Sequence, residues 1–153
     1  KDLGKLFFKM GMVFNESAPS SLGTIISFWL LGIGGSLKGK ENADKNDMKI
    51  ALENGISKLK ERANSKENEK TILDSLSPAT KVFEKNSAED KAIVEILKET
   101  YEAASKGSEA TKNMMAVHGR AAYHGEKTMG HVDGGSYVGR LIFEGIYNYY
   151  KEK

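Results

Sequence analysis

Cysteine is absent from the 153-residue chain, which excludes disulfide frameworks, thiolate zinc sites and thiol nucleophiles. The absence fits a reducing, cytoplasmic setting. Proline occurs only at Pro19 and Pro78, and alternating β-branched residues are scarce, so strands are poorly supported. No apolar run approaches the roughly 18 residues of a membrane span. The longest, from Ile25 to Ile33, is broken by Gly32, and we therefore expect no membrane segment.

An excess of charge of one sign is also lacking. The chain carries 23 basic and 21 acidic residues, for a formal net charge of +2. Nucleic-acid binding usually requires a clustered basic face, so we expect no nucleic-acid partner. The hydrophobic content of 39% and charged content of 29% are ordinary for a soluble globular protein. The length predicts one domain, since domains typically span about 100–200 residues.

Apolar residues recur at helical spacing along most of the chain. The segment from Leu22 to Leu37 is apolar on nearly all sides, which is typical of a buried helix. The fold class that this pattern predicts is all-α, a bundle of six or so amphipathic helices. The other expected helices are Leu3 to Phe14, Met48 to Leu59, Thr71 to Lys85, Ile93 to Ala104 and Ser136 to Tyr150.

Three local signals are expected to shape the later helices. Pro78 should kink or restart its helix, because proline lacks a backbone donor. Ser87 followed by Glu89 and Asp90 has the pattern of a helix cap for the next helix. Gly107 is expected to end or bend that helix.

The stretch from Gly119 to Gly135, GRAAYHGEKTMGHVDGG, breaks the helical pattern and holds five of the chain's 16 glycines. Glycines let backbone amides turn toward a ligand. A helix starting near Ser136 would add free amides and a positive dipole end, which suit a phosphate group. Arg120 could hold phosphate oxygens with its planar guanidinium. Asp133 could orient a ribose hydroxyl, a water or a metal.

On the residues alone, this stretch is equally compatible with a plain turn. It lacks the GxxxxGK[ST] pattern of a Walker motif. His118, His124 and His131 are six and seven residues apart, which suits neither one helical face nor an HxxxH pair. That spacing favours structural roles for His118 and His124, and the neighbouring Asp133 leaves His131 open.

Two other segments are likewise compatible with either a ligand-binding or a purely structural role. SAPSSLGT, from Ser17 to Thr24, precedes the buried helix, and its serines and glycine could cap either a phosphate or the helix itself. EKTILDSLSP, from Glu69 to Pro78, is a helix start on physical grounds alone.

Together the three segments resemble the ADP-binding L subunit (DhaL) of dihydroxyacetone kinase and the equivalent domain of single-chain dihydroxyacetone kinases. GRAAYHGEKTMGHVDGGS is similar to the family signature GRA-Y-GERS-GH-D-GA. EKTILDSLSPA resembles the family's GDKTM-D segment, and SSLGT resembles its Ser-Gly nucleotide loop. The segments occur in family order, and the resemblance covers essentially the whole chain.

The resemblance implies a barrel of antiparallel amphipathic helices, with the nucleotide bound at one end by the interhelical loops of a single domain over residues 1–153. It implies that the chain holds ADP or ATP with magnesium. Phosphoryl transfer would go to dihydroxyacetone or a related keto-sugar held by a separate K subunit. The phosphoryl donor would be ATP or a phosphohistidine protein of the phosphotransferase system, and a homodimer is compatible with the family.

Carried over position by position, the resemblance assigns phosphate contact to Arg120, the catalytic candidate. The cofactor-binding residues that it implies are Ser20, Ser21 and Gly23 in the small-residue loop, Thr71 and Ile72 near the adenine, and Asp133, Gly134 and Gly135 in the segment closing over the nucleotide. The departures from the family are Leu22 for serine, Ala63 for glycine, Ile72 for methionine and Gly134 for a frequent proline.

The family's magnesium site is a GDxDxG-type run of aspartates ahead of the position of Lys1, and this sequence holds no such run. Phosphoryl transfer needs cations to neutralise phosphate charge. We therefore expect no intact metal site here, and an N-terminally incomplete domain that is inactive alone. The alternative is a regulatory or binding module that keeps the fold without catalysis. A purely structural bundle would explain the helices but not the glycine-rich signature.

Overall fold

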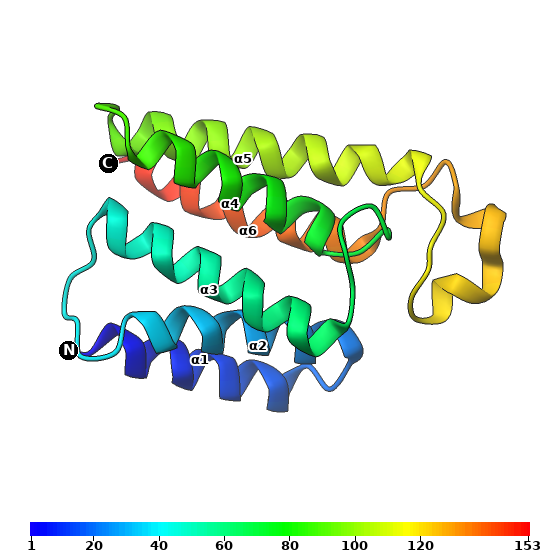
Figure 1. The fold of residues 1–153 in the computed structure, drawn as a ribbon, viewed down its shortest axis with the longest axis horizontal. Helices are drawn as coiled ribbons and strands as arrows, with labels where there is room; N and C mark the ends of the chain where they lie inside the picture. Colours follow the sequence, from blue (N-terminus) through cyan, green and yellow to red (C-terminus); the bar gives the residue numbers. More distant parts are fainter. The chain divides into compact units, whose positions relative to one another are not determined.

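Six α-helices and two short 3₁₀ segments form the regular structure of the chain, and the computed structural model describes every residue from Lys1 to Lys153 (Figure 1). No strand is present, so the all-α prediction is confirmed. None of the helices combines the length and apolarity needed to cross a membrane. The chain divides into two compact units, residues 1–64 and residues 65–153, and each is described by itself. The expectation of one nucleotide-binding domain over residues 1–153 stays a prediction.

The first unit packs two helices against a central one. Each helix begins at a side-chain cap, provided by Asp2, Ser20 and Asp44 in turn. Such caps satisfy N–H groups that have no partner inside the helix. The three helices are α1 (Leu3–Ser17), α2 (Ser21–Ser36) and α3 (Lys45–Ala63), and α2 contacts both of the others.

Helix α2 is the buried centre of this unit, as its composition predicts. Ile26, Trp29, Leu30 and Ile33 are buried on one face of the helix, and Ser27 and Gly32 are buried on other sides. Because α1 and α3 both pack on α2, it has little surface that needs polar residues. The prediction of a buried helix over this segment is confirmed.

The second unit packs three helices that all contact one another, followed in Figure 1 from green through red. Its apolar core includes Leu73, Leu76, Phe83, Ile96 and Phe143. The long connection between its second and third helices carries both 3₁₀ segments. The elements are α4 (Leu73–Ser87), α5 (Ile93–Ala110), η1 (Thr111–Asn113), η2 (Arg120–Thr128) and α6 (Gly134–Lys151).

Helices α4 and α5 approach each other closely at Pro78 and Gly107. Proline has no N–H to donate to the carbonyl of Asp74, four residues earlier. Gly107 packs beside that carbonyl: a Cβ built on Gly107 would lie 2.0 Å from the Asp74 oxygen and 2.9 Å from Pro78 Cγ. Both helices continue through these residues. A restart at Pro78 and a helix end at Gly107 are therefore wrong, while a kink at Pro78 or a bend at Gly107 stays a prediction.

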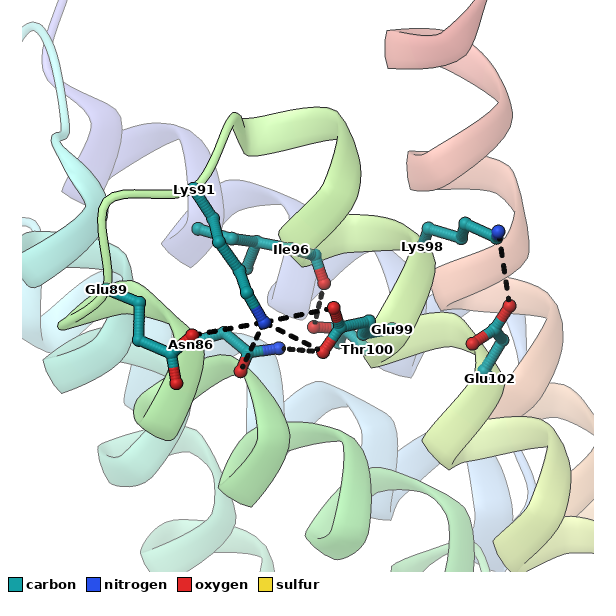
Figure 2. Close-up of polar contacts among 8 residues, drawn as sticks. All are labelled: Asn86, Glu89, Lys91, Ile96, Lys98, Glu99, Thr100 and Glu102. Atoms are coloured by element: carbon teal, nitrogen blue, oxygen red, sulfur yellow. Dashed lines mark hydrogen bonds and ion pairs between the residues drawn. The ribbon is translucent and has the colours of Figure 1, made fainter.

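A polar cluster closes the loop from α4 to α5 (Figure 2). Lys91 Nζ lies 3.1 Å from Glu99 Oε1 and 3.1 Å from Glu89 Oε2, and Asn86 Nδ2 donates to Glu99 Oε2 at 2.6 Å. Ser87 is the last residue of α4, and its hydroxyl donates to a carbonyl of the same helix. Helix α5 has no side-chain cap. The prediction of a cap at Ser87 is wrong, because Asn86 of α4, Glu89 and Lys91 of the loop and Glu99 of α5 fix this loop instead.

Candidate functional site

The glycine-rich stretch lies at the end of the second unit where α5 ends and α4 and α6 begin. Gly119, Gly125 and Gly130 have positive φ angles of 67°, 51° and 86°, a region that residues with side chains rarely adopt. No residue of η2 is buried. The stretch is therefore a surface segment that turns at its glycines and has no apolar core of its own.

Hydrogen bonds hold this segment at its base. The Gly130 N–H donates to the Lys112 carbonyl at 2.7 Å. The Thr128 hydroxyl donates to the Gly125 carbonyl at 2.7 Å and accepts from the Ala116 N–H at 3.1 Å. Because η2 buries no side chain, these bonds contribute much of what fixes its path.

The side chain of Lys70 holds the surface segment through hydrogen bonds to backbone carbonyls. Only 6% of its surface is exposed, and its Nζ donates to the carbonyl oxygens of Thr111, Thr128 and His131 at 2.8, 2.7 and 2.6 Å. Its φ of 61° is left-handed, a conformation that costs a non-glycine residue on the order of 1 kcal/mol. Burial lowers the pKa of Lys70, and the Asp133 carboxylate opposes that change. A buried cation on a strained backbone therefore joins Thr111, at the end of α5, to two points of the surface segment, Thr128 and His131.

The turn that carries Lys70 is anchored by Asp74, whose surface is 5% exposed. Asp74 Oδ1 accepts from the Asn68 N–H at 2.5 Å, and Oδ2 accepts from the Thr71 N–H at 2.8 Å. The Thr71 hydroxyl accepts from the Leu73 N–H at 3.2 Å. These bonds resemble the reciprocal pair of a capping box and satisfy the amides at the start of α4.

Asp133 caps the start of α6. Its Oδ2 accepts from the Ser136 N–H at 2.7 Å, and its own N–H donates to the Thr111 hydroxyl at 2.9 Å. Burial raises the pKa of the Asp133 carboxyl, while the hydrogen bond from Ser136 and the charge of Lys70 act in the opposite direction. The carboxylate thus stabilises the first turn of α6 although its surroundings disfavour its charge.

This environment predicts a pH-dependent effect of Asp133→Asn, which keeps a capping oxygen but removes the charge. The pKa of Asp133 is raised above 3.8 in the folded chain. At pH values between 3.8 and this raised pKa, the folded chain therefore binds more protons than the unfolded chain. The stability that wild-type Asp133 contributes therefore falls as pH rises through that window and is level above it. Urea unfolding of both proteins between about pH 4 and about pH 7 should show the variant gaining stability relative to wild type. A difference that stays constant over this range would contradict the raised pKa.

A second contact links the turn before α4 to the segment. His118 Nε2 lies 2.5 Å from Glu69 Oε2, and Glu69 also accepts from the Lys66 N–H at 2.8 Å. The Lys66 hydrogen bond, followed by the one to His118, holds the pKa of Glu69 below its usual value. His118 thus has the structural role that its spacing favours, whereas His124 and His131 are exposed. No group of three or more His, Asp or Glu side chains in the chain could hold a metal ion.

With this geometry in place, comparison with known proteins identifies the family. Residues 1–148 match the family described as the DAK2 domain. The chain belongs to the DAK2 domain family. The match extends over both units and includes all three segments that the sequence singled out.

The DAK2 domain is similar to several curated proteins. It is 29% identical over 150 residues to the "Probable dihydroxyacetone kinase" of Dictyostelium discoideum, covering 90% of this chain and 23% of that protein. It is 25% identical over 145 residues to the "PEP-dependent dihydroxyacetone kinase 1, ADP-binding subunit DhaL" of Listeria innocua, covering 95% of this chain and 67% of that subunit. It is 25% identical over 138 residues to the "Triokinase/FMN cyclase" of Mus musculus, covering 90% of this chain and 24% of that protein. The domain thus spans about a quarter of the longer relatives.

A solved structure supports the fold of the DAK2 domain. The crystal structure of the dihydroxyacetone kinase of C. freundii in its native form matches 97% of this chain and 24% of that chain, with a TM-score of 0.71 at 22% sequence identity. At this identity the likeness shows the fold, and it agrees with the all-helical architecture.

The second unit of the DAK2 domain contains most of the predicted site residues. Arg120 is the first residue of η2 and is exposed, with no hydrogen bond or ion pair within the chain. Gly134 and Gly135 form the first turn of α6, where N–H groups have no acceptor inside the helix. Ile72 is 2% exposed, so its side chain belongs to the core. The roles of these residues, and of Thr71 and Asp133, toward a ligand stay predictions.

Ser20, Ser21 and Gly23 lie in the first unit, at the start of α2. The Ser20 hydroxyl accepts from the Gly23 N–H at 3.0 Å and so caps the helix. A Cβ built on Gly23 would lie 1.9 Å from the Ala18 carbonyl oxygen, so the turn between α1 and α2 requires glycine there. Capping and close packing account for Ser20 and Gly23, Ser21 is exposed, and their roles toward a ligand also stay predictions.

The sequence interpretation of the DAK2 domain overlooked Lys70 and Asp74. Thr71 and Asp74 have the Thr-x-x-Asp spacing of a capping box, which could have identified the anchor. Lys70 lies in a polar loop, where a lysine is ordinarily solvent-exposed. Its burial depends on carbonyls 41, 58 and 61 residues away, which no local pattern reveals.

Proposed function

We propose that this DAK2 domain is the nucleotide-binding part of a dihydroxyacetone or related keto-sugar kinase. It holds ADP or ATP for phosphoryl transfer to a keto-sugar bound by a partner K subunit, in the cytoplasm and without a nucleic-acid partner. The family assignment supports this proposal, together with relatives named as dihydroxyacetone kinases and as an ADP-binding subunit.

The observation that carries the proposal is the exposed, unpartnered guanidinium of Arg120 on the surface segment that leads into α6. An arginine can make two parallel hydrogen bonds to phosphate oxygens. The first turn of α6 at Gly134 and Gly135 suits the same anion, because the start of a helix carries a partial positive charge. The Asp133 carboxylate shares this turn, since it interacts with the N–H groups of Gly135 and Ser136. We assign to Arg120 the phosphate contact and the stabilisation of charge during transfer.

The remaining assignments follow the same segments. Thr71 and Ile72 lie on the adenine side, where Ile72 provides apolar support from the core. Ser20, Ser21 and Gly23 form the small-residue loop of the first unit. A magnesium ion would neutralise phosphate charge in such a reaction. The residues present do not fit a metal site, so none of these roles depends on a metal ligand from this chain.

Calorimetric titration of the full-length protein with magnesium-ADP tests the role of Arg120. Arg120→Ala should weaken binding by about 10- to 100-fold, the loss expected for a hydrogen bond to a charged group. Arg120→Lys should recover only part of the affinity, because an ammonium group lacks the planar fork. Lys127→Ala is the matched control: it removes one exposed positive charge from the same 3₁₀ segment, and it should leave affinity nearly unchanged.

Two outcomes would overturn parts of the proposal. Equal affinities for wild type and Arg120→Ala would remove Arg120 from the site, and a wild type that fails to bind magnesium-ADP would remove the function. Transfer to dihydroxyacetone should be followed with ATP and with a PEP-charged phosphohistidine protein, since the Listeria innocua relative is described as PEP-dependent. Nucleotide binding without transfer from either donor in the presence of a K subunit would favour the regulatory module instead. Sedimentation of the same samples tests for a homodimer.

A further inference from the structure

Lys70 is a buried cation whose donors all meet carbonyl oxygens. A lysine ammonium has three N–H donors, and Thr111, Thr128 and His131 accept one each. No ion pair neutralises it, although the Asp133 carboxylate acts on it electrostatically. With 6% of its surface exposed and no donor left, Lys70 has nothing to offer a phosphate group directly. Any effect on a ligand must pass through the segment that it holds.

The three acceptors enclose the segment that carries Arg120. Thr111 follows the last residue of α5, Thr128 ends η2, and His131 lies two residues before Asp133, the cap of α6. The connection from α5 to α6 contains η2. The ammonium group of Lys70 therefore bonds both ends of this connection, at Thr111 and at His131, to the turn before α4. Since η2 has no buried residue, no apolar packing of that segment could replace these bonds.

We propose that Lys70 is a positioning residue: its ammonium group fixes the path of residues 111–133 and so sets where Arg120 and the first turn of α6 meet a ligand. The effect on a nucleotide rests on the proposed function. The effect on the path of the segment does not.

Lysine is particularly suited to this position. Its unbranched stem ends in donors that point in three directions from one atom, whereas the donors of arginine lie in one plane. The turn that aims it is held by Asp74 and includes left-handed residues at Asn68 and Lys70, with φ of 69° and 61°. A methionine at this position would fill similar space but leave three inward carbonyls without donors.

Hydrogen exchange measured by mass spectrometry, without nucleotide, tests the path-setting role. In Lys70→Met, amides of residues 111–133, including those of Gly130 and Asp133, should exchange at least about tenfold faster, while those of α2 and α5 stay protected. Lys66→Met is the matched control: it removes an exposed positive charge four residues earlier and should change no protection. An unchanged segment in Lys70→Met would overturn the proposal, as would faster exchange spread evenly over all helices.

A chemical rescue keeps the test valid if Lys70→Met folds poorly. The chain has no cysteine, so Lys70→Cys can be alkylated uniquely while unfolded and then refolded. Bromoethylamine installs a side chain of lysine's length that ends in an ammonium group, and iodoacetamide installs a neutral amide. Restored protection of residues 111–133 with the first reagent but not the second supports the ammonium as the fixing group. Equal protection with both reagents would overturn it.

Affinity for magnesium-ADP, measured on the full-length protein, separates this proposal from the proposed function. Lys70→Met should bind at least about tenfold more weakly than wild type and the Lys66→Met control. If wild type itself binds no nucleotide, the proposed function fails. The exchange result still tests whether Lys70 fixes the path of residues 111–133. If affinity falls but exchange of residues 111–133 is unchanged, Lys70 does not act by positioning, and the proposal is overturned.

Discussion

Gly107→Ala is expected to lower the free energy of unfolding by about 3 kcal/mol, at the upper end of the usual range for overpacking. The added Cβ would lie 2.0 Å from the carbonyl oxygen and 3.2 Å from the carbonyl carbon of Asp74, and 2.9 Å from Pro78 Cγ. These neighbours are backbone atoms and a proline ring, which cannot rotate aside as a flexible side chain would. Relief of the clash therefore requires α4 and α5 to move apart.

Urea unfolding followed by circular dichroism measures this effect. Gly145→Ala is the matched control, because Gly145 lies within α6 and a Cβ there would meet nothing within 4 Å. It should stabilise the chain by up to about 1 kcal/mol through the higher helix propensity of alanine. Similar stability changes in both variants would show that propensity, and not the contact between α4 and α5, governs Gly107.

Asp74→Asn is expected to destabilise the chain by about 2–3 kcal/mol, the range for hydrogen bonds to a charged acceptor. The side chain keeps its size, but only one oxygen remains for the N–H groups of Asn68 and Thr71. The new amide would direct its own N–H at one of these donors in a place that is 5% exposed. The turn carrying Lys70 should therefore loosen.

The same unfolding measurement tests Asp74→Asn, with hydrogen exchange reporting on the turn. Glu95→Gln serves as control, because Glu95 is an exposed carboxylate in the first turn of α5. Its loss should cost about 0.5 kcal/mol through the helix dipole alone. A loss in Asp74→Asn no larger than in this control, with the exchange of residues 67–71 unchanged, would contradict the anchoring role.

Helical periodicity predicted the elements that depend on local spacing. The expected helix from Leu22 to Leu37 corresponds to α2 (Ser21–Ser36), and the expected helix from Ser136 to Tyr150 lies inside α6. The predictions of helix breaks failed where the course of one helix depends on its contact with another. Pro78 and Gly107 each suggest a helix break locally, but Gly107 packs at the carbonyl that Pro78 cannot bond, so both helices continue.

The candidate site shows the same division. The glycine-rich stretch and Arg120 were visible because glycine and arginine have strong local signatures. Lys70 was not, because its carbonyl partners become neighbours only when α4, α5 and α6 have packed. The cap of α5 was also mispredicted, since Lys91 in the loop pairs with Glu99 of α5, which in turn accepts from Asn86 of α4.

The absence of buried side chains in η2 means that core packing does not constrain the side chains of this segment. The residues from Ala121 to Lys127 can change in size, charge or polarity without opening a cavity in the core, since the segment is held mainly through Lys70 and backbone groups at its base. Apart from Gly125, whose positive φ favours glycine, sequence variation there is expected to change the free energy of unfolding little. If this segment contacts the nucleotide as proposed, a library randomised over these positions, with Lys70 and the glycines retained, would sample ligand preference on a constant scaffold.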